Sequence, residues 1–147
     1  RDRLEELNNM PLHPLFVHFP IALLSLATII SILHLFLKKI NLSITLTTLL
    51  TTGMVFGIIS YILGDSGEAF AIQHYGMQHV EKLVHLHETF ALTSLITYGF
   101  ATSTQIGSMW FIKYKKLCTG ATVILTIIGF VLLIITGHLG ASITYGK

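Results

Sequence analysis

The sequence is poor in charged residues, and this poverty excludes an ordinary soluble domain. Only 11% of its 147 residues are charged, whereas a soluble globular domain carries about 25%. Hydrophobic residues make up 52% of the chain. So few charges cannot give an apolar core a polar surface in water, and the composition therefore predicts an integral membrane protein.

The chain also lacks the motifs of several functional classes. Its single cysteine, Cys118, excludes an internal disulfide, a cysteine-based metal site and the Cys-x-x-Cys-His motif of covalently bound haem. His87-Glu88 does not begin a zinc-protease motif, because Phe90 and Ala91 follow where the second histidine is needed. No glycine-rich phosphate loop or Gly-x-Ser-x-Gly elbow is present, and the net charge of +2 argues against a nucleic-acid partner. The sequence therefore predicts no catalytic activity of its own.

Four apolar segments are long enough to cross a bilayer, which takes about 20 residues. They cover residues 15–37, 42–63, 84–106 and 117–138. None contains Lys, Arg or Asp, and the only acid within them is Glu88, close to an end. We therefore expect one all-α transmembrane domain over residues 1–147, a four-helix bundle with a long loop between the second and third helices.

Charged residues separate to the two sides of this predicted bundle. We call the side of the two short connections the lysine side and the opposite one the histidine side. All seven acids fall on the histidine side: Asp2, Glu5, Glu6, Asp65, Glu68, Glu81 and Glu88. The lysine side carries Lys38, Lys39, Lys113, Lys115 and Lys116; the histidine side carries Arg1, Arg3, Lys82 and Lys147. The positive-inside rule then makes the lysine side cytoplasmic, and both termini and the long loop periplasmic, in a bacterial inner membrane.

The long connection, residues 64–83, carries local helix signals. Residues 65–68 have the form of a capping box, which favours a short helix on the membrane surface; an ordered surface loop is the alternative. Helical spacing upstream of His87 indicates that the third helix starts early, near Val80. That start turns His87 toward the bundle and His85 in another direction.

Histidines are concentrated on one side of the membrane. The eight are His13, His18, His34, His74, His79, His85, His87 and His138. All except His34 fall on the histidine side or at its boundary. Ionisable groups at membrane depth are energetically costly, so such a cluster is a candidate functional site.

Three of these histidines, His18, His87 and His138, lie at matched depth on different helices. Two of them stand above small residues at helical spacing: His18-Ala22-Ser25 on the first helix and His87-Ala91-Ser94 on the third. Two parallel helices with this pattern supply an imidazole from each side and room for a flat macrocycle between them. The alternative is close helix packing, which also explains Gly53, Gly57, Ser60 and Gly64 on the second helix.

The other histidines have plainer interpretations. His74, His79 and His85 are expected to be interfacial polar residues, and His34 to extend its ring to the membrane surface beside Lys38. His13 and His138 are the remaining candidates, either as ligands of a second group or as residues that orient the first.

Three stretches resemble a known family. Residues 11–23 (PLHPLFVHFPIAL) closely resemble the first helix of a bacterial family of four-helix membrane domains of unknown function, whose signature is His-Pro-Leu-x-Val-His-Phe-Pro-Ile-Ala. His87-Glu88-x-x-Ala91 is similar to the opening of that family's third helix. Residues 137–146 resemble the ending of a branch that is commonly joined to c-type cytochrome domains, with Ala141 for a glycine and Tyr145 for a histidine.

The resemblance implies a membrane b-type cytochrome that carries electrons. It implies haem b, one or two per chain, with His18 and His87 as axial ligands and His13 and His138 at a second haem or beside the first. The implied partners are a c-type cytochrome or other redox subunits of a membrane complex, with quinol as a candidate electron source. Two alternatives stay open: a zinc or copper site built from the clustered histidines, and a cofactor-free anchor subunit of a larger complex.

Overall fold

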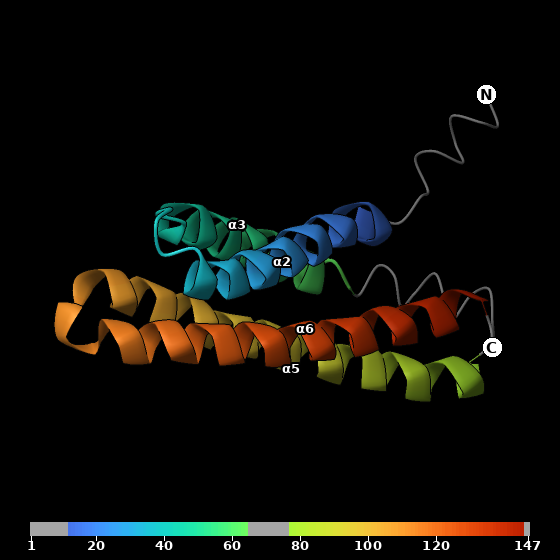
Figure 1. The fold of residues 1–147 in the computed structure, drawn as a ribbon. Helices are drawn as coiled ribbons and strands as arrows, with labels where there is room; N and C mark the ends of the chain where they lie inside the picture. The colour runs from blue at the N-terminus through green and yellow to red at the C-terminus, as the bar shows by residue number, and fades with distance from the viewer. Residues whose placement is uncertain (1–11, 65–76, 146–147) are drawn as a thin grey trace, which may run out of the picture.

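The computed structural model describes residues 12–64 and 77–145, and this part of the chain is helical apart from its turns. The elements are α2 (Leu12–Phe36), α3 (Ser43–Ile62), α5 (Met77–Trp110), the 3-10 turn η1 (Ile112–Tyr114) and α6 (Lys115–Tyr145). They form two antiparallel hairpins, α2–α3 and α5–α6, that lie against each other (Figure 1).

Both short turns lie at one end of the bundle, and the N-terminal ends of α2 and α5 lie at the other (Figure 1). We call these the lysine end and the histidine end, after the residues that the sequence assigns to each. Helix α2 packs mainly on α3 and α6, and α5 packs on α6 and α3. The parallel helices α2 and α5 therefore occupy diagonal positions.

The helix boundaries agree with the predicted segments in the middle and extend beyond them at the histidine end. Helix α5 begins at Met77, earlier than the expected start near Val80, and α6 continues to Tyr145. His138 therefore lies inside α6 and not at its end. The apolar runs indicate only the part of each helix suited to the bilayer, and polar residues prolong the helices beyond it. The surface helix predicted from residues 65–68 lies outside the described residues.

Three helices are long and apolar enough to cross a membrane. The qualifying stretches are Val17–Phe36, Ser43–Ile62 and Ile112–Ile143, with mean hydropathies of 2.2, 1.5 and 2.6. The prediction of spanning segments is confirmed for these three by length and composition. Helix α5 is not among them, and its sequence is rich in Ser, Thr, Tyr and Gln on both its buried and its exposed faces.

The bundle has more polar side chains inside than a soluble protein and an apolar outside. Its buried polar residues are Thr28, Ser31, Ser60, Ser94, Gln105, Ser108, Thr122, Thr126 and Thr136. Large apolar side chains point outward instead, as Phe36 and Ile62 do at 75% and 67% exposure. This distribution suits a molecule surrounded by lipid, where hydrogen bonds and close packing hold helices together.

The centre of the bundle is filled by Tyr98. Its ring is fully buried and lies against Gly129, where an added Cβ would come within 2.8 Å of the ring. Its hydroxyl is 2.9 Å from Thr28 Oγ1, which also donates to the Leu24 carbonyl at 3.0 Å. One aromatic side chain thus joins α5 to both α6 and α2.

Candidate functional site

One histidine at the histidine end, His87, is held by a hydrogen bond to a neighbouring helix. It lies on α5, is partly buried, and faces α6. Its Nδ1 atom is 3.0 Å from the backbone carbonyl oxygen of Thr136. His85, two positions earlier, is exposed, so the structure agrees with the predicted divergence of these two side chains.

The contact with Thr136 determines where the His87 ring carries its proton. A carbonyl oxygen only accepts hydrogen bonds, so Nδ1 must be the protonated nitrogen. In the neutral ring, Nε2 then has a lone pair that can accept a hydrogen bond or bind a metal. Metal-ligating histidines commonly have their other nitrogen fixed by a carbonyl in this way.

Gly140 allows α6 to approach this ring. A Cβ added at Gly140 would lie 3.3 Å from Cε1 and 3.5 Å from Nδ1 of His87. Gly140 lies one helical turn after Thr136. Its backbone therefore packs against the same edge of the imidazole that donates to the Thr136 carbonyl. The sequence gave no signal for Thr136, because its contact with His87 is made by its backbone carbonyl.

His18 has a different environment, on the exposed surface of α2. The next two residues pack on α3: the rings of Phe19 and Phe56 stack with centroids 5.3 Å apart, and Pro20 lies against Gly57. Figure 1 shows α2 close to α6 near the lysine end and further from it toward the start of α2. Because α2 diverges there, no packing against α6 buries the His18 ring.

The two small-residue stripes do not face each other. On α5, Ser94 is buried and donates to the Gly129 carbonyl at 3.3 Å, so that stripe packs on α6. On α2, Ala22 is exposed, and the buried face carries Leu24 and Ala27 instead. The expected arrangement, with a macrocycle between the two stripes, is therefore not the one seen. The packing interpretation holds for α5, as it does for Gly53 and Gly57 on α3, which lie against Leu24 and Leu95.

His138 points away from His87. Thr136 and Gly140 are four residues apart and share the α6 face that meets His87. His138 lies midway between them, about 200° around the helix, and is exposed. The structure therefore does not pair His138 with His87 within one chain. The side chain of His13 lies outside the described residues.

The remaining histidines do not form a metal cluster in the part that the structure describes. No three His, Cys, Asp or Glu side chains come together there in a way that could hold a metal ion. His74 and the side chain of His79 lie outside this part. At the other end, His34 is partly buried, and its Nδ1 atom is buried without a hydrogen-bond partner among the described residues. The expectation that its ring extends to the membrane surface stays a prediction.

Helices with an apolar exterior, a hydrogen-bonded interior and several histidines at one end define a helical membrane bundle. Comparison with protein families agrees: the family described as "Predicted membrane protein (DUF2231)" matches residues 9–147. The chain belongs to this family. No curated protein and no solved structure matches the chain.

Proposed function

We propose that the chain is a b-type cytochrome-like electron-transfer subunit that binds haem b at the histidine end through His87 and His18. The observation that carries this proposal is the hydrogen bond from His87 Nδ1 to the Thr136 carbonyl, 3.0 Å long. It fixes the tautomer in which Nε2 carries the lone pair that a histidine ligand of iron needs. The family resemblance of residues 11–23 supports the same function.

The surroundings of His87 fit an axial ligand. The ring is partly buried, which limits the access of water, and the carbonyl contact makes the imidazole a better electron donor. Gly140 lets the α6 backbone support the ring edge without a clash. These residues therefore hold the imidazole in one orientation before any ligand arrives, which lowers the entropy lost on binding.

In this proposal His18 supplies the second imidazole. It lies on α2, which runs parallel to α5, and its exposed ring is accessible to a group that enters from outside the bundle. Tyr98 and Leu24 fill the bundle centre, so we place the haem at the histidine end and not between the helix midpoints. Held by His18 and His87, a haem would supply one-electron transfer and not oxygen chemistry. His13 and His138 remain the candidates for a second haem.

We also propose that α5 crosses the membrane as the fourth span. Its hydroxyl groups are bonded along its own helix: Thr93 donates to the Thr89 carbonyl at 2.7 Å, and Thr97 to the Thr93 carbonyl at 2.8 Å. Such bonds lower the cost of placing a hydroxyl in lipid. The histidine end then faces the periplasm of a bacterial inner membrane, where a c-type cytochrome is the proposed partner and quinol a candidate electron source.

The test is a reduced-minus-oxidised visible spectrum of the purified chain, with a pyridine haemochrome assay for haem per chain. We expect a b-type α-band that His87→Ala and His18→Ala each abolish or shift, while His85→Ala leaves it unchanged. A colourless chain that takes up no added haem would contradict the proposal. So would a His87→Ala variant with a full complement of unaltered haem.

A second variant separates ligation from folding. His87→Asn keeps a side-chain N–H close to the position of Nδ1, so it can still donate to the Thr136 carbonyl, but it has no Nε2. We expect this variant to fold and to lose the haem ligand. If His87→Asn retained the parent spectrum, His87 would be a packing residue only.

A further inference from the structure

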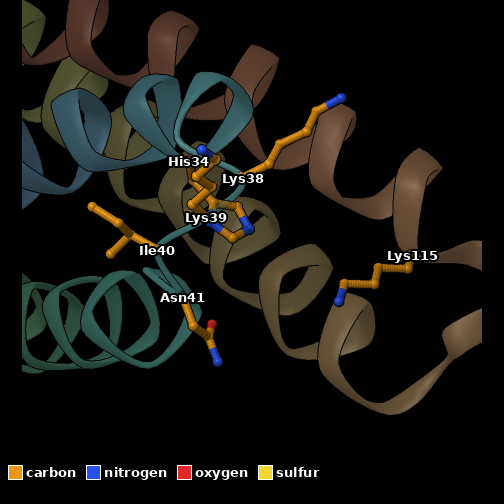
Figure 2. A pocket seen from close by; sticks show the side chains of 6 residues that line it. All are labelled: His34, Lys38, Lys39, Ile40, Asn41 and Lys115. Carbon is orange, nitrogen blue, oxygen red and sulfur yellow. The ribbon is translucent and has the colours of Figure 1, made fainter.

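At the lysine end, a hollow of about 350 Å³ lies between the two hairpins. Its lining residues are His34, Lys38, Lys39, Ile40, Asn41 and Lys115. Figure 2 shows Lys115 reaching this hollow from the start of α6, whereas the other five belong to α2 and to the turn that follows it. The site therefore exists only when the two hairpins are packed together.

The hollow collects positive charge, and neither α2, the turn after it nor α6 contains an acidic residue to neutralise it. Three lysines line it, and the sequence has no Asp or Glu between residues 7 and 64 or after Glu88. Like charges gathered on one concave surface repel one another, so their proximity is unfavourable unless an anion is bound. The sign and number of these charges favour a bound ligand that carries a full negative charge.

His34 and Asn41 also line the hollow, and both carry hydrogen-bonding groups. The buried Nδ1 atom of His34 has no hydrogen-bond partner among residues 12–64 and 77–145. A buried polar atom left in this state costs free energy, which the ring would recover by turning toward the hollow and donating a hydrogen bond to a ligand oxygen. Asn41 uses its Oδ1 atom to accept from the Ser43 backbone N–H at 3.2 Å, so its amide NH₂ is the part left to donate.

We propose that this hollow binds the phosphate group of an anionic phospholipid headgroup. Three ammonium groups together with imidazole and amide donors match the several acceptor oxygens of a phosphodiester. Basic pockets between membrane helices on the cytoplasmic side are suited to such headgroups.

A lipid is favoured over a free anion by the apolar surface beside the charges. Ile40 lines the hollow and is 54% exposed, and Phe36, one turn earlier, is 75% exposed. Trp110, the last residue of α5 at the same end, is 79% exposed, as is typical of an aromatic residue at a membrane surface. Acyl chains next to the headgroup would cover such surface, whereas inorganic phosphate would not.

The test measures lipid binding to the delipidated full chain in detergent by native mass spectrometry. Phosphatidylglycerol is compared with phosphatidylcholine of the same acyl chains, at about 0.15 M salt so that attraction beyond about 8 Å is screened. The test variant is Lys38→Gln/Lys115→Gln, which removes two lysines of the hollow. The matched control is Lys113→Gln/Lys116→Gln, which removes two lysines of the same end that do not line it.

We expect the parent chain to prefer phosphatidylglycerol and the test variant to lose that preference by about 25-fold, or roughly fivefold per lysine. The control variant should stay within about threefold of the parent, because its charges act only at long range. Equal binding of the two lipids by the parent, or equal losses in both variants, would overturn the proposal. Displacement of the lipid by millimolar inorganic phosphate would overturn the lipid assignment and indicate a free-phosphate site.

Discussion

His87 on α5 and Thr136 on α6 are joined by a 3.0 Å contact between an imidazole nitrogen and a backbone carbonyl oxygen. The contact links the two helices at the histidine end and fixes the tautomer of one side chain. Its acceptor belongs to the backbone, so no residue type at position 136 reveals it. Gly140 and Gly129 let α6 come this close to α5.

Gly140→Ala should weaken the hold on His87. The new Cβ would lie 3.3 Å from Cε1, so the ring must shift by a few tenths of an ångström and its bond to Thr136 must lengthen. Gly137→Ala is the matched control, because a Cβ there meets nothing within 4 Å. We expect Gly140→Ala to be less stable than Gly137→Ala by about 1 kcal/mol. The free energy of unfolding in mixed micelles measures this, and equal stabilities would show that the ring accommodates a methyl group freely.

Gly129→Ala should lower the free energy of unfolding more than Gly140→Ala does. An added Cβ would meet the Tyr98 ring at 2.8 Å, and that ring is fully buried and hydrogen-bonded through its hydroxyl. We expect a loss of about 2–3 kcal/mol relative to Gly120→Ala, where a Cβ on the same helix meets nothing within 4 Å. The same unfolding assay tests this difference. A difference below about 0.5 kcal/mol would mean that α5 and α6 can separate without loss.

Thr28 and Tyr98 should be energetically coupled. Their hydroxyl oxygens are 2.9 Å apart and join α2 to α5 at the bundle centre. In a double-mutant cycle of Thr28→Val and Tyr98→Phe, we expect a coupling free energy of about 0.6 kcal/mol, typical of hydrogen bonds between membrane helices.

The control for this cycle is Thr93→Val combined with Tyr98→Phe. The Thr93 hydroxyl is exposed and bonds only within α5, at 2.7 Å from the Thr89 carbonyl. This pair should be additive. Coupling of the same size in both cycles would attribute the effect to α5 itself and not to the contact between α2 and α5.

The orientation in the membrane can be tested by cysteine labelling in a Cys118→Ser background. Glu81 on the histidine end and Lys116 on the lysine end are both exposed. If the lysine end is cytoplasmic, an impermeant maleimide should label Glu81→Cys in intact cells and Lys116→Cys only after permeabilisation. The reverse pattern would place the histidine end in the cytoplasm and exclude a periplasmic cytochrome partner.

Most of the fold was predictable because lipid imposes simple rules on a sequence. A spanning helix must satisfy its backbone internally, so long apolar runs indicate helices without knowledge of their partners. Residues 42–63 illustrate this, since α3 runs from Ser43 to Ile62. Helix α5 was harder to delimit, because its polar inner face and its extension to Met77 do not follow the apolar run.

The candidate site was predictable in its residues and not in its geometry. Helical spacing correctly predicted that His87 faces the bundle and that His85 faces outward. The matching stripes below His18 and His87 suggested that the two helices face each other, yet α2 and α5 occupy diagonal positions. Spacing along one helix defines its faces, but it does not define which neighbour each face meets.

By itself, the sequence determined that this protein is a helical membrane bundle with its histidines and lysines at opposite ends, because composition and periodicity act locally along the chain. Only the tertiary structure decided that His87 lies against Thr136 and Gly140 of α6, that His18 is exposed, and that Lys115 and Lys38 line one hollow. The first depends on how α5 and α6 pack within their hairpin, and the other two on how that hairpin packs against α2–α3. That packing is set by the fit of side chains such as Tyr98 against glycines on other helices, which no single segment encodes.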